Sequence, residues 1–239
     1  MSEAQSNSIA NLGKSLEARV AAELEARPLT EFDALLDLKN LKGESTGYVK
    51  VFEGNRVVKG SSVSIDLMPG VRYFNFHFIP DPHYNAPRYL FEGMLMPHGS
   101  QVSMDLFPDF DVIANLDDYL QGYSAVGEVY EEIRNDDRFL LQPSRLMHMR
   151  ALSSPVFTLC FNVPVDNLPA IEAYAERYFD AWLDMLRNAS SLSDDEAERR
   201  RHLRQEIGDS IVRLDPDRHM VVQVYGEETT CMIEAGSMY

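Results

Sequence analysis

Residues 61–107 alternate between apolar and polar side chains, and this pattern constrains the fold more than any other feature of the sequence. The alternation occurs on both sides of a Pro69–Gly70 turn in SSVSIDLMPGVRYFNFHFIP. It occurs again around Pro97–Gly99 in RYLFEGMLMPHGSQVSMDLFP. A period of two residues is typical of β-strands, and short turns rich in proline and glycine join antiparallel neighbours. The pattern predicts four adjacent antiparallel strands, at about 61–68, 71–79, 88–96 and 100–107.

Helical patterns precede and follow these strands. Apolar residues recur every three or four positions in 1–27, which predicts an amphipathic helix that ends at Pro28. A second short helix is expected near 31–41, followed by a stretch in which three glycines predict turns. These glycines are Gly43, Gly47 and Gly54.

The second half of the chain is predicted to be mostly helical, with one further strand within 150–163. Ser193 and Glu196 have the spacing of a capping box, so a helix should begin there. Amphipathic patterns predict helices at about 116–136, 165–189, 193–209 and 215–228. Helices on both faces of an antiparallel sheet are the economical arrangement, so we expect a single α/β domain over 1–239, a three-layer α/β/α sandwich with a central antiparallel sheet flanked by helices.

The composition argues against several classes of protein. No apolar run approaches the roughly 18 residues of a membrane span, and the N-terminus lacks the apolar centre of a secretory signal. A formal net charge of −16 disfavours nucleic acids and anionic membranes as partners. Cys160 and Cys231 are too few to hold an iron–sulfur cluster or a structural zinc ion. We expect a cytoplasmic protein, or a processed protein of the plastid stroma, without a tightly bound metal or cofactor.

Several polar residues interrupt the apolar pattern, and each also has an ordinary explanation. Asn75 and His77 share one face of a strand whose other face carries phenylalanines, and that polar face could simply meet solvent. Glu92 interrupts an apolar strand, and Asp66 interrupts another; solvent exposure would explain both. Asp215 precedes a proline, a common pattern at the start of a helix. None of these residues identifies a site by itself.

Four separated motifs give these residues a context. The first motif, between two predicted strands, is FIPDPHYNAP (78–87), and the second is the following strand with its central acid. The third motif is MDLFP (104–108), and the fourth, near the C-terminus, is DPDRHMVVQVYGEE (215–228). This order resembles that of the ferredoxin-dependent bilin reductases, a superfamily that includes red chlorophyll catabolite reductase. The resemblance covers about 60–239, and the first 60 residues carry little of it. It implies an oxidoreductase that acts on CH–CH bonds of a linear tetrapyrrole, with reduced ferredoxin as the electron donor.

Matched residue by residue, the resemblance implies a catalytic site at Asn75, Glu92 and Asp215. Asn75 falls at a position that is His in some bilin reductases and Asn in others. Glu92 matches a central acid that is Asp in most of them, and the Glu form is more similar to the chlorophyll-catabolite branch. Asp215 matches an acid near the C-terminus. A carboxyl group buried against a pigment has a raised pKa and serves as a proton donor.

Other residues are candidates for binding the substrate or the electron donor. His77 lies on the strand face of Asn75, although a histidine packed in the core would fit the pattern as well. The resemblance implies substrate contacts for Asp66, and contacts with the substrate carboxylates for Arg150, Ser153 and Ser154. Ferredoxins are acidic, so the densest basic cluster is a candidate docking site, although it could also be an ordinary solvated helix face. This cluster is Arg199, Arg200, Arg201 and Arg204.

The function that follows is the reduction of a biliverdin-like bilin or a chlorophyll catabolite, coupled to protonation by buried carboxylates. Two alternatives remain. The chain could be a non-catalytic bilin carrier or chromophore chaperone, because a Glu at position 92 places the acid one methylene away from where an Asp would place it. It could also be an enzyme of the same fold with another conjugated substrate. The sequence does not choose between a monomer and a homodimer.

Overall fold

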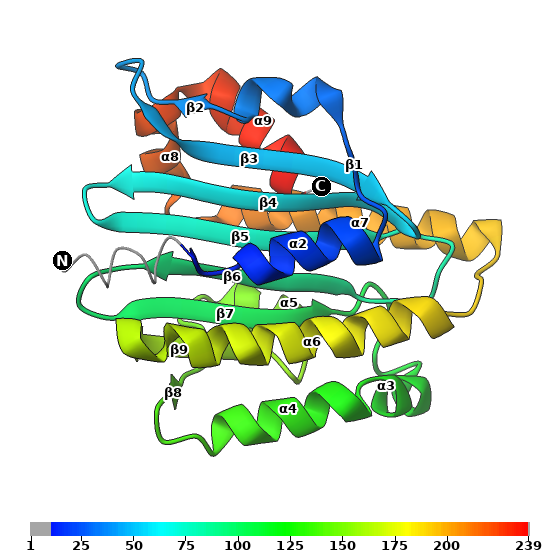
Figure 1. Cartoon of the computed structure of the whole chain (residues 1–239). Coiled ribbons are helices and arrows are strands. Elements are labelled where there is room, and N and C mark those ends of the chain that lie inside the picture. The colour runs from blue at the N-terminus through cyan, green and yellow to red at the C-terminus, as the bar shows by residue number, and fades with distance from the viewer. Residues whose placement is uncertain (1–10, 239) are drawn as a thin grey trace.

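A nine-stranded antiparallel sheet forms the centre of the molecule in the computed structural model, which describes residues 11–238 except the side chain of Asp118 (Figure 1). The strand order is β1-β3-β4-β5-β6-β7-β9-β8, and β2 pairs with β3. Helices cover both faces, which confirms the predicted three-layer α/β/α sandwich. The strands are β1 (Arg27–Pro28), β2 (Leu38–Lys39), β3 (Ser45–Gly54), β4 (Val57–Met68), β5 (Val71–Pro80), β6 (Arg88–Leu95), β7 (Ser100–Phe107), β8 (Leu140–Leu141) and β9 (Thr158–Val163).

Helices α2 and α6 lie on one face of the sheet, and α7, α8 and α9 lie on the other, while α3 and α4 lie beyond the β8 edge (Figure 1). None of the helices within 11–238 is long and apolar enough to cross a membrane. The helices are α2 (Lys14–Glu23), α3 (Leu116–Gly122), α4 (Ser124–Arg134), α5 (Met147–Leu152), α6 (Leu168–Asn188), α7 (Asp194–Leu214), α8 (Arg218–Tyr225) and α9 (Glu227–Ser237), with short 3-10 helices η1 (Thr30–Leu35) and η2 (Val165–Asn167).

The alternation along β5 and β6 sends large aromatic side chains to the face covered by α2 and α6, which we call the aromatic face. Phe78 has no exposed surface and packs against Tyr89, Phe179 and Trp182, with ring centroids 5.2 to 5.7 Å apart. The polar atoms of these rings are partnered: Trp182 Nε1 donates to the Pro87 carbonyl at 2.8 Å, and Tyr89 donates to the Ala175 carbonyl at 3.0 Å. The rings around Phe78 therefore form a packed core, and a cavity of about 580 Å³ adjoins it between α2, η1 and the sheet.

The predicted capping box begins α7. Ser193 Oγ accepts the Glu196 N–H, and the Glu196 carboxylate accepts the Ser193 N–H at 3.0 Å. Two of the four orphan N–H groups at this end of the helix are thereby satisfied. The helix continues five residues beyond the predicted end, to Leu214, and so delivers Asp215 to the face of the sheet opposite the aromatic core.

The N-terminal quarter differs from the expectation. The predicted helix over 1–27 is present as α2, and the part before residue 11 lies outside the described residues. The helix expected near 31–41 is instead the short η1 followed by β2, and the predicted turns at 43–54 are strand β3. Gly47 lies inside that strand because the neighbouring strand passes very close: a Cβ there would lie 1.9 Å from the Ser64 carbonyl oxygen.

Three differences occur in the second half. The helix predicted at 116–136 is two helices, α3 and α4, and the strand predicted within 150–163 begins only at Thr158, after helix α5. The last helix is broken at Gly226, which has φ 78° and separates α8 from α9. This break folds α9 back over the sheet next to α8 (Figure 1).

Candidate active site

Three polar residues lie side by side across the centre of the sheet. In the observed register Asn75 of β5 is opposite Glu92 of β6, and Glu92 is opposite Ser103 of β7. Directly opposite residues place their side chains on the same face of a sheet. This face is covered by α7, α8 and α9, and we call it the polar face. Tyr73 joins the group because it lies two residues before Asn75 on the same strand.

Glu92 accepts hydrogen bonds from all three of its polar neighbours. Tyr73 Oη and Asn75 Nδ2 donate to its Oε2 at 3.0 and 3.3 Å, and Ser103 Oγ donates to Oε1 at 3.3 Å. Burial raises the pKa of Glu92 above its ordinary value, and the nearby Asp215 charge adds to this, although the three hydrogen bonds oppose it. The group can therefore hold a proton at a higher pH than an ordinary glutamate.

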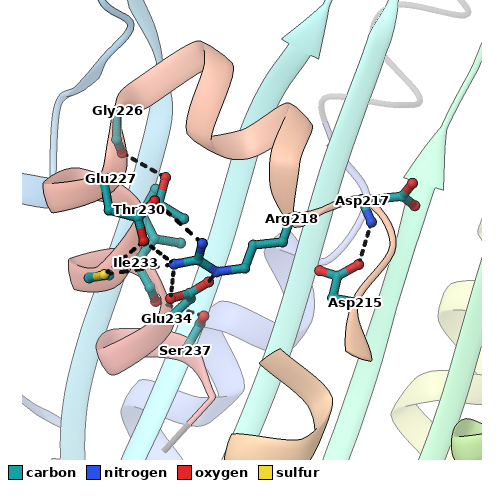
Figure 2. Close-up of polar contacts among 10 residues, drawn as sticks. Asp215, Asp217, Arg218, Gly226, Glu227, Thr230, Ile233, Glu234 and Ser237 are labelled. Atoms are coloured by element: carbon teal, nitrogen blue, oxygen red, sulfur yellow. Dashed lines mark hydrogen bonds and ion pairs between the residues drawn. The ribbon is translucent and has the colours of Figure 1, made fainter. Parts of the chain in front are cut away.

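Asp215 lies on the loop between α7 and α8, over the strands of the sheet, as Figure 2 shows. Its carboxylate accepts the Asp217 N–H at 2.8 Å, which fixes the start of the turn into α8. The side chain is solvent-exposed, yet crowding by protein atoms and the charges of Asp217 and Glu234 raise its pKa. Its charge also raises the pKa of Glu92 and of Tyr73, so the two carboxyl groups lie within electrostatic range of one another.

The loop that carries Asp215 is held by a clamp between α8 and α9 (Figure 2). Arg218, three residues after Asp215, has Nε 2.6 Å from Glu234 Oε1 and Nη2 2.6 Å from Glu227 Oε1. The guanidinium group of Arg218 thus binds two carboxylates of α9 in a fixed orientation, on the side of α8 that adjoins the loop. This clamp fixes where α8 begins and so where Asp215 lies.

His77 is buried on the polar face, in the next row of the register. Its Nδ1 is 2.9 Å from the Ser237 carbonyl oxygen, which ties the end of α9 to the sheet. Burial and the positive charge of Arg88 lower the pKa of His77 to about 4, so its ring is neutral near pH 7. A neutral ring bonded through Nδ1–H to a carbonyl leaves Nε2 as a free acceptor, and Nε2 has no partner among the described residues.

The residues predicted to hold substrate carboxylates are engaged by the protein itself. Arg150 donates to the Ser144 carbonyl at 2.6 Å, and Ser153 donates to the Met149 carbonyl at 2.6 Å. Ser154 donates to the buried carboxylate of Asp105 through both its hydroxyl and its N–H. Helix α5, which carries Arg150, packs against α7. In this arrangement a substrate role for the three residues stays a prediction.

Asp66 does not join the site. It is opposite Arg72 in the register, and Arg72 is opposite Leu95, a residue of the aromatic core. Asp66 therefore lies on the face opposite Glu92, where its carboxylate pairs with Arg72 Nε at 2.8 Å. The sheet separates Asp66 from Glu92 because Asp66 is one residue out of step in the alternation, and the predicted substrate contact stays a prediction.

The predicted docking cluster is not one surface. Arg200 is 5% exposed and donates to the carbonyls of Tyr84 and Ala86, while the Arg204 side chain is 10% exposed and binds Asp109. Both arginines hold the 78–87 crossover against α7 and are unavailable for docking. Arg199 and Arg201 point to solvent from the same helix.

Three residues of the site were not among the predicted site residues. Tyr73 and Ser103 contact Glu92 directly, and Asp105 is buried two residues further along β7. Burial raises the pKa of Asp105 to about 7, against hydrogen bonds from Ser154 and the Leu106 N–H. The alternation along β5 contained the signal for Tyr73, because it shares the face of Asn75. Nothing in the sequence marks the register that brings Ser103 to Glu92.

The chemistry available here is proton transfer and hydrogen bonding. Within residues 11–238, no group of three or more His, Cys, Asp or Glu side chains is arranged to hold a metal ion. The site combines a carboxyl group of raised pKa, a second carboxyl within electrostatic range, a phenol and an amide. These groups can hold and donate protons, and they can orient a polar edge of a flat ligand.

The similarity of the chain to known proteins lies in its structure. No protein-family model matches the sequence, and a comparison with curated proteins finds no match. Among solved structures, phytochromobilin synthase from tomato in complex with biliverdin matches with a TM-score of 0.77. The identity is 14%, and the match covers 93% of this chain and 80% of the other. The chain therefore has the fold of phytochromobilin synthase, as its resemblance to the ferredoxin-dependent bilin reductases implied.

Proposed function

We propose that this protein reduces a linear tetrapyrrole, either a biliverdin-like bilin or a chlorophyll catabolite, with electrons from reduced ferredoxin. The observation that carries the proposal is Glu92, a carboxyl of raised pKa at the centre of one sheet face, in a fold shared with a structure that binds biliverdin. Reduction of one double bond takes up two electrons and two protons. The protein's part would be to place the protons.

Glu92 would act as the main proton donor. When one electron enters a conjugated pigment, the radical anion becomes more basic and takes a proton from a nearby acid. Tyr73, Asn75 and Ser103 hold the Glu92 carboxyl in one orientation, so its proton would be offered at one position of the pigment. Once Glu92 has lost its proton, the same three donors would stabilise its carboxylate.

Asp215 would supply or relay the second proton. Its position on an exposed loop connects the site to solvent, from which both carboxyl groups would regain their protons between electron transfers. Because the Asp215 charge raises the pKa of Glu92, the two groups would titrate as a pair, and the first deprotonation would hinder the second. Asn75 cannot exchange protons readily, so its amide would orient a lactam group of the pigment.

Reduced ferredoxin would supply the electrons, because it is the electron donor in the superfamily that the chain resembles. Arg199 and Arg201 remain candidates for the docking surface, since both are exposed on α7. Their contribution would be electrostatic, so neutralising them should slow turnover most at low salt. Unchanged turnover and unchanged salt dependence in an Arg199→Gln, Arg201→Gln double variant would show that ferredoxin docks elsewhere.

The experiment that tests the function is an anaerobic assay with biliverdin. Purified protein is mixed with the pigment, and a ferredoxin reducing system is then added while the absorption spectrum is recorded. A spectral shift on mixing followed by loss of the long-wavelength band on reduction supports the enzyme. A parallel assay with a chlorophyll-derived linear tetrapyrrole identifies the substrate class.

A carrier of the same fold is the alternative, and the same assay separates it from the enzyme. The carrier would bind the pigment and shift its spectrum, but reduction would cause no further change in either assay. One observation favours this alternative: Glu92 is already satisfied by three protein donors, so it could have become a structural residue. If neither pigment binds, both functions are excluded.

A further inference from the structure

A second polar region lies on the same sheet face as Glu92, beyond His77. A cavity of about 540 Å³ opens there between the sheet, α7 and Met238, the residue that follows α9. Lys59 and Arg88 line it from the strands, and Arg201 and Arg204 line it from the helix. Four basic side chains around one cavity are unusual in a chain with a formal net charge of −16.

The carboxylate of Asp109 does not balance the positive charges of the two arginines that contact it. Asp109 receives Arg88 Nε on one oxygen at 2.8 Å and Arg204 Nε on the other at 2.5 Å. Burial opposes ionisation of Asp109, but the two guanidinium charges hold its pKa below the ordinary value. One carboxylate between two guanidinium groups leaves one positive charge over, and Lys59 adds another.

Nearby acids reduce this excess but do not remove it. Asp81 also lines the cavity, and its carboxylate, which accepts the ring N–H and backbone N–H of His83 at 2.8 and 2.9 Å, offsets one positive charge. Arg201 at the rim is paired with Glu198 at 2.8 Å. His77 is neutral near pH 7 because its pKa is lowered to about 4. Lys59 donates to the Ala235 carbonyl at 2.9 Å, a neutral partner. Arg88, Arg204 and Lys59 against Asp109 and Asp81 therefore leave one positive charge at the buried end of the cavity.

Two nitrogens in this cluster lack partners. Arg88 Nη2 and Arg204 Nη2 are both buried, and neither has a hydrogen-bond partner among the described residues. Arg88 is 2% exposed. A buried donor without an acceptor costs about 1–3 kcal/mol, and a charged one costs more. An acceptor with negative charge would satisfy both nitrogens and balance the excess charge.

We propose that this cavity is a binding site for a carboxylate, held by Arg88 and Arg204 with Lys59 and Arg201 at its rim. Guanidinium groups bind planar carboxylates through paired N–H donors, which suits this ligand class. The ligand must be small or must present a narrow tail, because both guanidinium groups are buried. The site follows from charge and geometry alone, and it would exist whether or not the chain reduces a tetrapyrrole.

Such a carboxylate has two sources, a free small acid or the propionate tail of a pigment. Arg88 lies four residues before Glu92 on β6 and on the same face, about 13 Å away along the strand. A flat pigment beside Glu92 could therefore direct a tail toward the cavity. This use of the site rests on the proposed function, whereas the binding of a free carboxylate does not.

Titration with sodium propionate tests the site in the full chain. NMR spectra selective for arginine Nε–H groups would follow Arg88 and Arg204, whose Nε–H groups are held by Asp109. Both signals should shift and saturate at millimolar propionate, while sodium chloride at equal ionic strength should not reproduce the shift. Absence of a saturable shift would overturn the proposal and leave ordered water as the partner of the two nitrogens.

Variants on one helix provide a matched comparison. Arg201→Gln and Arg199→Gln each remove one exposed positive charge from α7, but only Arg201 lines the cavity. Lys59→Gln removes a second rim charge. Propionate binding should weaken about fivefold in Arg201→Gln and in Lys59→Gln, and should be unchanged in Arg199→Gln. Equal weakening in Arg199→Gln would mean that propionate senses only the overall charge, and the site would be rejected.

Two pigments then identify the source of the carboxylate. Biliverdin and its dimethyl ester differ only in whether the propionate tails are charged. If a tail occupies the cavity, saturation with biliverdin should abolish the propionate shift and saturation with the ester should preserve it. If the ligand is a free acid, propionate should bind equally in both complexes. If neither pigment binds, the proposed function fails while the propionate titration still decides the site.

Discussion

The two faces of the central sheet are built from alternate residues of the same strands, yet they meet opposite demands. On the aromatic face, Phe78, Tyr89 and Trp182 pack ring against ring, and the polar atoms of Tyr89 and Trp182 are hydrogen-bonded. On the polar face, buried side-chain atoms lack partners: Ser61 Oγ, Asn75 Oδ1, His77 Nε2, Arg88 Nη2 and Arg204 Nη2. Within residues 11–238, five of the six buried side-chain atoms without a partner thus lie on the polar face, and the sixth, Tyr119 Oη, belongs to the aromatic core.

This difference separates stability from function within single strands. A filled core contributes to the free energy of unfolding in proportion to the apolar surface it buries. Polar atoms without partners cost stability and are retained where a ligand uses them. Substitutions on the two faces should therefore change different measured quantities.

The largest effect should come from Glu92→Gln, which keeps the shape of the side chain but removes the proton. We expect kcat for pigment reduction to fall by about a hundredfold to ten-thousandfold, because that is the range that general acid catalysis contributes. Pigment affinity should change little. Glu53→Gln on β3 is the control, since Glu53 pairs with Arg27 at the sheet edge. A Glu92→Gln variant with normal kcat would remove this residue from the mechanism.

Truncation on the aromatic face should have the next largest effect, on stability instead of turnover. Phe78→Ala removes a ring with no exposed surface, and we expect a loss of about 3–5 kcal/mol in the free energy of unfolding. Urea denaturation measures it. At temperatures where the variant is folded, the pH dependence of pigment reduction should match the wild type. A changed pH profile would show that the two faces are not independent.

The pH dependence of stability should come from the polar face, through Asp105. Its pKa is raised to about 7, so the folded protein binds this proton more tightly than the unfolded chain does. Between about pH 4 and pH 7 the unfolded chain therefore loses the proton first, and stability falls as pH rises, by up to about 4 kcal/mol.

Asp105→Asn cannot ionise and should lack this loss. Urea denaturation at pH 4.5 and at pH 7.5 gives the comparison, and the wild type should lose more stability than the variant between these two values. Asp184→Asn, on the exposed side of α6, should behave as the wild type does. If Asp105→Asn shows the wild-type slope, another group is responsible.

The smallest and most specific test uses two adjacent serines of β4. Ser61 Oγ is buried on the polar face without a partner, whereas Ser62 Oγ lies on the other face and donates to Glu17 at 2.8 Å. Ser61→Ala should raise the free energy of unfolding by up to about 1 kcal/mol, and Ser62→Ala should lower it by about 1 kcal/mol. Loss of stability in both variants would mean that ordered water already satisfies Ser61.

The sequence was sufficient for the part of the molecule where one pattern dominates. Alternation predicted β5, β6 and β7 closely, and it placed Asn75 and His77 on one face. The pairing of Asn75 with Glu92 required the register, which depends on the length of the turns as well as on the pattern. Asp215 was found only through the resemblance, because an Asp before a proline has no distinctive pattern.

The failures have physical causes that are local. Strand β3 was missed because Gly47 reads as a turn, although it is there to permit close approach of β4. The docking cluster was misread because charge density does not reveal which side of a helix is covered. The inward stripe of α7 is Ala197, Arg200, Arg204 and Gly208, at spacings of three and four, and this spacing could have shown that two of the arginines face the protein.

The hairpin turns at Pro69–Gly70 and Pro97–Gly99 also limit how this gene can change length. Side chains alternate between faces with every residue, so one codon gained or lost within β6 would exchange the acid at 92 for a neighbour that belongs among the phenyl rings. A change of two codons would return each side chain to its original face, but the residue opposite Asn75 and Ser103 would no longer be Glu92. Length variation among descendants of this chain should therefore collect in the turns, and the strands between them should vary only by replacement.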